Sequence, residues 1–268
     1  MTHLCRELPT LVAHYELAQR NRIASGALLR SAASPGSNAT LEELHATELR
    51  AERSLARAMA ACVEEHPTWP WLESVKGIGP TLSARLLARL RIERAPTPSS
   101  FWQYCGLSTV PGDRYRCLDC AATITIAAGR TPPTRHHMQD GRACAAALIH
   151  DRAPEVRVAV RYATRGQRRP FDAEARSLCH MIGTSFLRRG TRYRRVYDAR
   201  RERLEGQKPG WSKMHRHLAA MRVMEKLFLA HLWMVWRGQT GAEVRLPYEV
   251  ARRGRAGSVI SPWEMAGA

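Results

Sequence analysis

Two cysteines separated by two residues, Cys117 and Cys120, are the clearest chemical signal in the sequence. Two thiolates at this spacing can share one tetrahedral metal ion through a tight turn. A second pair, drawn from His136 or His137 with Cys144, would complete a Cys₃His set, although the six residues between His137 and Cys144 are a wide spacing. With His137 as the fourth ligand and His136 as its alternative, the pattern predicts one structural zinc ion, because four protein ligands leave no position for a substrate. The other interpretation is a pair of reduced surface cysteines beside an unrelated histidine pair.

The second candidate site is a glycine turn, Gly77-Ile78-Gly79-Pro80, between two apolar helical stripes. Leucine or valine occupies every third or fourth position on both sides of the turn, from Leu72 to Leu90. This spacing predicts two short helices that meet at a sharp corner, a helix-hairpin-helix. Glycine permits the positive φ or the close approach that such a corner demands, and proline suits the first turn of the second helix.

The start of the second helix in this unit offers a site for an anion, because its first amide groups have no partner within the helix. The candidate contacts to the phosphate backbone of a nucleic acid are Lys76, Gly77, Ile78, Gly79 and Arg85. The alternative is an ordinary corner between two core helices, since a Gly-x-Gly pair alone is a weak signal.

The charge of the chain indicates the same class of partner. Its 268 residues include 42 Lys or Arg and 24 Asp or Glu, which gives a net charge of +18 and a pI of about 10.6. Such an excess favours a polyanion over a small acidic metabolite. Residues 161–208 hold 14 of the basic and 5 of the acidic residues, so this segment carries half of the net charge.

The basic segment interleaves arginine with aromatic residues, a composition suited to phosphate contact and base stacking. Tyr193 and Tyr197 are the candidate stacking residues. The candidate phosphate contacts are Arg188, Arg189, Arg192, Arg194 and Arg195. For any single arginine, the alternative is a solvated helix face.

The sequence contains no stretch of ~20 consecutive apolar residues that would span a membrane, and its first residues lack the basic-then-apolar order of a signal peptide. We therefore expect a cytoplasmic protein without membrane association. In that compartment the seven cysteines are not expected to form a disulfide framework, which is a further reason to test the closely spaced ones as metal ligands.

The elements that must position these residues are predicted to be mainly α-helical, with a small zinc-ribbon-like β insertion. Residues 1–70 have the periodicity of an antiparallel helical hairpin, whose seam is either internal or a homodimer contact. Residues 71–109 form the helix-hairpin-helix unit, and residues 110–160 form the insertion, with one strand near residues 121–128. Residues 161–268 form a basic C-terminal helical region.

The C-terminal region is predicted to contain a helix near residues 171–188 and a long apolar helix from Ser212 to Gly238. The histidines of the long helix, His215, His217 and His231, are expected to be hydrogen-bonded structural residues rather than metal ligands. The tail after Pro247 is basic and expected to be loosely ordered.

Several of these segments resemble a known family. The run from Val75 to Thr81, followed by Ala84 and Leu87 and then by Phe101-x-x-Tyr104-Cys-Gly-Leu107, is similar to the C-terminal domain of insertion-sequence transposases of the "IS one-ten / IS one-sixteen / IS nine-oh-two" group. The resemblance covers about residues 72 to 237 and is weaker beyond the hairpin. It implies a DNA-binding, transposition-related domain from a recombinase that normally joins a RuvC-like acidic N-terminal domain to a serine nucleophile.

Two departures from the family bear on activity. Residues 1–70 have a helical pattern with solvated acids instead of the ribonuclease-H-like sheet, so the acidic tetrad is absent. The family's serine lies in a Ser-Gly pair soon after the Gly-Leu that corresponds to Gly106-Leu107, whereas here only Ser108 is near and its glycine is missing. Ser108 is therefore a weak catalytic candidate, because a serine needs an activating base or metal to become a nucleophile.

The resulting hypothesis is a DNA-binding, transposase-like protein without a recognisable acidic catalytic domain. One alternative is an active serine-dependent recombinase that works with a partner or a guide RNA. Another is an RNA-binding module, because charge does not discriminate RNA from DNA.

Overall fold

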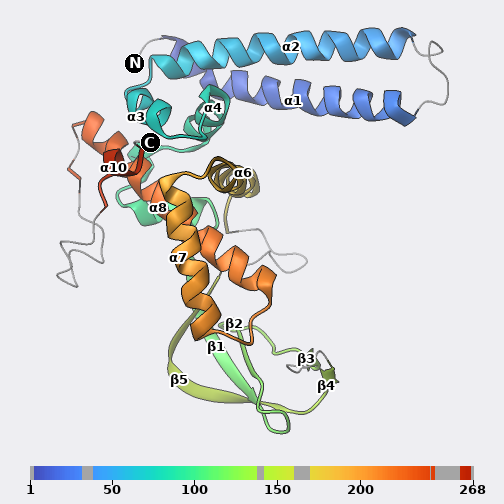
Figure 1. Cartoon of the computed structure of the whole chain (residues 1–268), viewed down its shortest axis with the longest axis vertical. Helices are drawn as coiled ribbons and strands as arrows, with labels where there is room; N and C mark the ends of the chain where they lie inside the picture. The colour runs from blue at the N-terminus through green and yellow to red at the C-terminus, as the bar shows by residue number, and fades with distance from the viewer. Residues whose placement is uncertain are drawn as a thin grey trace.

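The computed structural model describes residues 3–31, 39–137, 142–159, 170–241, 243–244 and 260–266, with the side chains of all of these except residues 3–5, 137 and 152–155. The described chain is mainly helical and carries a small antiparallel sheet (Figure 1), which confirms the coarse fold class. No helix among the described residues is both long and apolar enough to cross a lipid bilayer.

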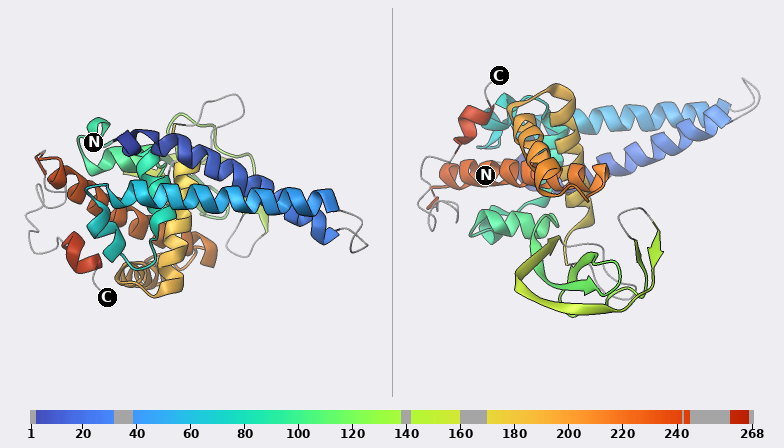
Figure 2. Two further views of the ribbon diagram at one scale, coloured as in Figure 1. Left: turned by 90° about the horizontal axis from the view of Figure 1, so that it is seen from above. Right: turned by 60° about the horizontal axis from the view of Figure 1, so that its bottom comes forward.

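Helices α1 (His3–Ser31) and α2 (Ala39–Glu64) form the predicted antiparallel pair, which projects from the body of the molecule (Figures 1 and 2). Leu8, Val12 and Tyr15 of α1 are buried at the body end of the pair, where they join the main core. The outer half of the seam is more polar, and it includes a 3.0 Å contact between Ser25 Oγ and His45 Nδ1. The pair is therefore anchored to the body at one end only.

The body begins with two short helices, α3 (Trp69–Ser74) and α4 (Pro80–Arg89), joined by a turn with Gly77 at φ +96°. They are followed by the 3₁₀ helix η1 (Ile92–Arg94) and by α5 (Pro98–Tyr104). Proline stands in the first turn of α3, α4 and α5, where its fixed φ and its missing N–H are tolerated. The buried faces of α3 and α4 join the main core.

The sheet is formed by β1 (Thr109–Cys117), β2 (Thr123–Ala127) and β5 (Leu148–Ala159), in the antiparallel order β2-β1-β5. Two very short strands, β3 (His136–His137) and β4 (Ala143–Cys144), form a separate antiparallel pair in which His136 is opposite Cys144. The strand near residues 121–128 was predicted, whereas β1 and β5 were not. The sheet lies at the side of the body away from the α1–α2 pair (Figure 1).

The C-terminal region folds into α6 (Ala173–Arg189), α7 (Arg192–Gln207) and α8 (Lys213–Gln239). Each helix begins at a side-chain cap that stabilises its first turn: Asp172 accepts from the Ala175 amide, Thr191 from that of Arg194, and Ser212 from that of His215. The predicted start of the long apolar helix at Ser212 is confirmed. Its buried face lies at the centre of a core that also receives residues from α1 to α7.

The last described helix, α10 (Pro262–Ala266), corrects the expectation of a loosely ordered tail for its final residues. Met265 and Ala266 are buried, and Trp71 Nε1 donates a 2.9 Å hydrogen bond to the carbonyl oxygen of Pro262. The basic residues between 245 and 259 lie outside the described part of the chain.

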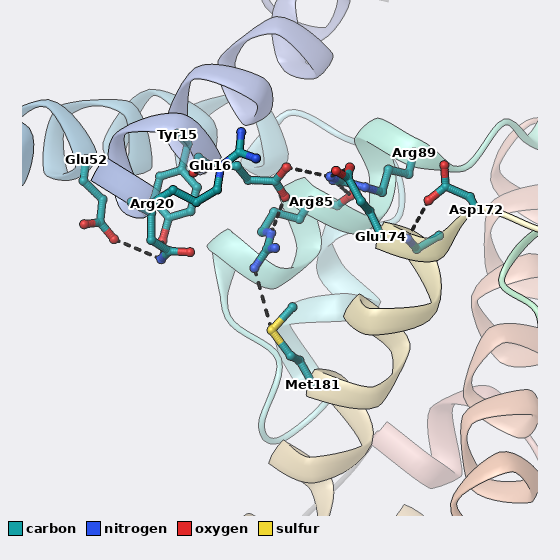
Figure 3. A network of polar contacts seen from close by, with 11 residues as sticks. Tyr15, Glu16, Arg20, Glu52, Arg85, Arg89, Asp172, Glu174 and Met181 are labelled. Atoms are coloured by element: carbon teal, nitrogen blue, oxygen red, sulfur yellow. Dashed lines mark hydrogen bonds and ion pairs between the residues drawn. The ribbon is translucent and has the colours of Figure 1, made fainter. Parts of the chain in front are cut away.

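A network of charged side chains ties α1 to the body (Figure 3). Glu16 accepts from Arg85 at 2.8 Å and from Arg89 at 2.7 Å, and Arg89 also pairs with Glu174 at 2.8 Å. The Glu16, Arg85 and Arg89 side chains are 12–17% exposed, so solvent screens these pairs only partly. The network joins α1, α4 and α6, three elements that are far apart in the sequence.

Candidate metal centre and nucleic-acid interface

The structure brings four potential metal ligands together beside the sheet. Cys117 ends β1, Cys120 lies in the following turn, and His136 and Cys144 lie opposite each other on β3 and β4. Their ligand atoms all lie within 4.8 Å of one another, so this cluster could hold a metal ion. Of the two histidines that the spacing left open, the cluster contains His136. The side chain of His137, the expected fourth ligand, lies outside the described part of the structure.

The separation of two of the sulfur atoms suits tetrahedral coordination. Cys117 Sγ lies 3.8 Å from Cys144 Sγ, and Cys120 Sγ lies 3.1 Å from His136 Nε2. A tetrahedral ion with metal–sulfur bonds of about 2.3 Å would separate two sulfur ligands by about 3.8 Å. His136 is only 6% exposed and points Nε2 toward the cysteines, which leaves Nδ1 as the nitrogen away from the cluster.

Local backbone geometry holds the first cysteine pair in place. The Cys117 amide donates to the carbonyl oxygen of Ala122 at 2.9 Å, and Ala121 adopts a positive φ of 54°, so the chain reverses tightly after Cys120. The Cys120 and Asp119 amides donate to the Cys117 sulfur and lower its pKa. The Ala122 amide acts to lower the pKa of Cys120, but burial and the other two thiols raise it overall. Three thiols crowded in this way favour a bound cation, because adjacent thiolates repel.

The turn between α3 and α4 rests on the last two turns of α6. Ser185 Oγ donates a 2.6 Å hydrogen bond to the carbonyl oxygen of Gly77. A Cβ atom at Gly77 would lie 3.1 Å from Ser185 Oγ and 3.4 Å from Arg189 Cγ, so glycine allows a close approach here as well as the positive φ. Ser185 was not predicted as part of this site.

This contact brings two separately predicted phosphate-binding segments side by side. Lys76 is exposed in the turn, and Arg188 and Arg189 are exposed at the end of α6. Gly190 then takes the left-handed conformation, and α7 begins with Arg194 and Arg195 on its exposed side. We call the set made of the Lys76–Gly79 turn, Arg188, Arg189, Arg194 and Arg195 the basic corner.

Three of the expected phosphate contacts lie differently from the prediction. Arg85 is held by Glu16, which already compensates its charge. Ile78 is 6% exposed, and its amide bonds to the Val75 carbonyl oxygen at 3.1 Å instead of facing solvent. Arg192 is half-buried and donates to the carbonyl oxygen of Glu264. Gly79 is exposed, but its φ of −108° is ordinary, so only Gly77 needs glycine for its conformation.

The predicted stacking role of two tyrosines is wrong. Tyr193 is fully buried, with its ring stacked on Phe186 at 4.8 Å between centroids and its hydroxyl 2.7 Å from His231 Nδ1. Tyr197 is 5% exposed and bonds through its hydroxyl to His217 Nδ1 at 2.7 Å. Both tyrosine rings lie in the core and are inaccessible to a nucleic-acid base. The hydrogen-bonded structural role predicted for His217 and His231 is confirmed.

Ser108, the weak catalytic candidate, lies between α5 and β1 and is partly exposed. Its amide donates to the Trp102 carbonyl oxygen at 3.2 Å. Within the described residues, no hydrogen bond joins its hydroxyl to a histidine, lysine or carboxylate. The described structure therefore supplies no activating base for Ser108 as a nucleophile.

No curated protein matches the chain. A family model does match, over residues 70–113. This segment begins at the second residue of α3, contains the glycine turn, α4, α5 and Ser108, and ends within β1, before the first residue of the Cys/His cluster. The resemblance seen in the sequence is thereby confirmed for this segment: residues 70–113 match the transposase family described as IS116/IS110/IS902.

Proposed function

We propose that this chain is a transposition-related protein that binds duplex DNA through the basic corner. The observation that carries the proposal is the Ser185–Gly77 hydrogen bond, which places the glycine turn against the arginine-rich end of α6. Two segments with independent signals for phosphate binding thus lie in contact with each other. The transposase match over residues 70–113 includes the glycine turn and supports DNA as the polyanion.

The binding mode is contact with the sugar–phosphate backbone. Helix α4 has ten residues and its N-cap, Gly79, offers no side-chain cap, so the amides that follow Pro80 are available to an anion. The arginines of the basic corner would neutralise phosphates, which positions a duplex without reading its sequence. The aromatic residues expected to add base stacking are buried, which favours a duplex over a single strand with free bases.

The Cys117, Cys120, His136 and Cys144 cluster has a structural role in this proposal, with zinc as the metal. Cysteine and histidine are the ligands that zinc prefers, and four of them leave no open position for water or substrate. The three-stranded sheet has little buried apolar surface of its own, since Cys117 is the one residue of β1 and β2 that is fully buried. The metal would fix the positions of β1, β3 and β4, which the chain's own packing holds weakly.

The test compares the affinity of the purified chain for a 30-base-pair duplex, the matching single strand and a structured RNA, each at two salt concentrations. Preference for the duplex, with affinity that falls steeply as salt rises, supports the proposal. A preference for structured RNA would instead favour the RNA-binding alternative, and no binding at low salt would end both.

A further inference from the structure

A second group of cations, separate from the basic corner, lies at the junction of α5, β1, β5 and α8. It consists of Lys226 and Arg222 on α8 and of Arg157 on β5. We propose that these three residues bind one phosphate group of a nucleic-acid strand. The identification of that phosphate as part of a nucleic acid rests on the function proposed above. The existence of an anion site does not depend on that function.

Trp102 holds Lys226 in a defined position. Its indole nitrogen donates a 2.8 Å hydrogen bond to the Lys226 carbonyl oxygen, and the Lys226 ammonium group lies over the indole ring, 4.3 Å from the centroid. Among the described residues, no carboxylate forms an ion pair with Lys226. The Lys226 ammonium group therefore lies over an aromatic ring and, within the described residues, forms no ion pair with a carboxylate.

Both arginines lie near enough to Lys226 for their charges to act on it. Arg222 precedes Lys226 by four residues, which puts both side chains on one face of α8. Arg157 donates from Nε to Thr109 Oγ1 at 3.0 Å and from Nη2 to the Thr109 carbonyl oxygen at 2.9 Å. Thr109 follows Ser108, whose amide donates to the Trp102 carbonyl oxygen at 3.2 Å. The bonds to Thr109 therefore hold Arg157 near Trp102.

Physical chemistry favours an anion at this junction. Burial lowers the pKa of Lys226, and the charges of Arg222 and Arg157 lower it further. The indole ring beneath the ammonium group offsets part of the free-energy cost of keeping Lys226 charged, but an indole carries no net charge. A phosphate group would offset the remainder, because its oxygens accept hydrogen bonds from an ammonium group and from guanidinium groups at the same time.

The rate of acetylation of Lys226 reports whether phosphate binds at this site. The folded chain is treated with an amine-acetylating reagent, and the rate at each lysine is followed by mass spectrometry in inorganic phosphate and in chloride of equal ionic strength. Phosphate is expected to slow the reaction at Lys226 about fivefold, as for a site that is about four-fifths occupied. Lys213, an exposed lysine at the start of the same helix, is the internal control and should change little.

Two variants make the test specific. R157L changes an exposed side chain and R222L changes the neighbour on α8, and either should remove the protection of Lys226 without altering the rate at Lys213. Circular dichroism and urea unfolding establish that each variant is folded. If phosphate protects Lys226 no more than Lys213 in the wild-type chain, the site does not exist.

A further experiment with a duplex oligonucleotide tests whether the phosphate bound at this site belongs to a nucleic acid. A duplex that binds the wild-type chain should protect Lys226 as phosphate does, and a bound duplex that leaves Lys226 as reactive as before would overturn the assignment to nucleic acid. Protection by inorganic phosphate, combined with no binding of any oligonucleotide, would keep the anion site and contradict the proposed function.

Discussion

The hydroxyl group of Ser185 donates a hydrogen bond to the carbonyl oxygen of Gly77, 108 positions earlier in the chain. This bond fixes the turn between α3 and α4 against α6 and thereby sets the distance between Lys76 and the arginines at the end of α6. The basic corner depends on this packing, because the packing adds Lys76 and the glycine turn to the four arginines of α6 and α7.

Replacement of the two glycines of the turn should have unequal effects on stability. Gly77→Ala forces a side chain into a φ of +96° and against Ser185, so we expect a loss of about 2 kcal/mol in the free energy of unfolding. Gly79→Ala adds a methyl group where no atom lies within 4 Å, at an ordinary φ, and should cost less than about 1 kcal/mol. Urea denaturation of both variants measures the difference, and equal losses would contradict the turn geometry.

Removal of metal should unfold the sheet before the helical body. The chain purified without added metal is expected to contain about one equivalent of zinc by elemental analysis, and a chelator should abolish the near-ultraviolet signal of Tyr115 in β1. His136→Ala should lose the zinc, whereas the adjacent His137→Ala should retain it, because only His136 lies in the described cluster. A metal-free wild-type chain with native stability would exclude a structural zinc ion.

The Glu16 carboxylate should contribute measurably to the attachment of α1. Glu16→Gln leaves Arg85 and Arg89 partly buried with fewer charge-assisted bonds, and we expect a loss of roughly 2–3 kcal/mol. Glu43→Gln removes an exposed carboxylate from α2 and should change stability by less than about 0.5 kcal/mol. Thermal unfolding of the two variants at low and high salt compares them, and equal effects would show that the network of Figure 3 adds no stability.

One buried carboxylate should make stability depend on pH. Burial raises the pKa of Glu225 to about 7, and the nearby charges of Arg222 and Arg176 oppose this rise. His180 Nδ1 lies 3.8 Å from Glu225 Oε1. The folded state therefore holds this proton more tightly than the unfolded state, and its contribution to stability is present below about pH 4.5 and is lost as pH rises through about 7.

The expected size of this effect is about 3 kcal/mol, since the pKa differs by roughly 2.5 units between the two states. The half-buried His66 and the buried His231, each with a pKa lowered to about 4 by burial, act in the opposite sense, because their contribution is lost as pH falls below 6.5. Glu225→Gln should remove only the first effect. The difference in unfolding free energy between wild type and variant should change between pH 5 and 8, and a constant difference would contradict the buried carboxylate.

The helices were predictable because their signals are local. Ser212 caps α8 and an apolar stripe continues to Trp236, so the start and the buried face of this helix follow from the sequence. Strand β1 was not predictable in the same way, since Pro111 and Gly112 interrupt it and its side chains are mostly half-buried, without a clear alternation. Local composition also failed for Tyr193 and Tyr197, because an arginine-rich segment does not show which of its faces meets the core.

The candidate sites were predictable in part. The Cys117–Cys120 spacing located the Cys₃His cluster, but the pairing of β3 with β4, which brings His136 into it, depends on strand register. The glycine turn and the arginines were found separately, whereas their contact through Ser185 depends on the packing of α6. Arg85 was misassigned because its partner, Glu16, lies 69 positions away.

The central claim is tested most directly by the salt dependence of duplex binding in a matched pair of variants. Arg188→Ala with Arg189→Ala removes two exposed cations from the basic corner, and Arg53→Ala with Arg57→Ala removes two exposed cations from α2. The wild-type slope of log K against log salt should fall in magnitude by about 1.8 in the first variant, as two lost phosphate contacts require, and should be unchanged in the second. Equal slopes in all three proteins, or binding that does not respond to salt, would contradict the account.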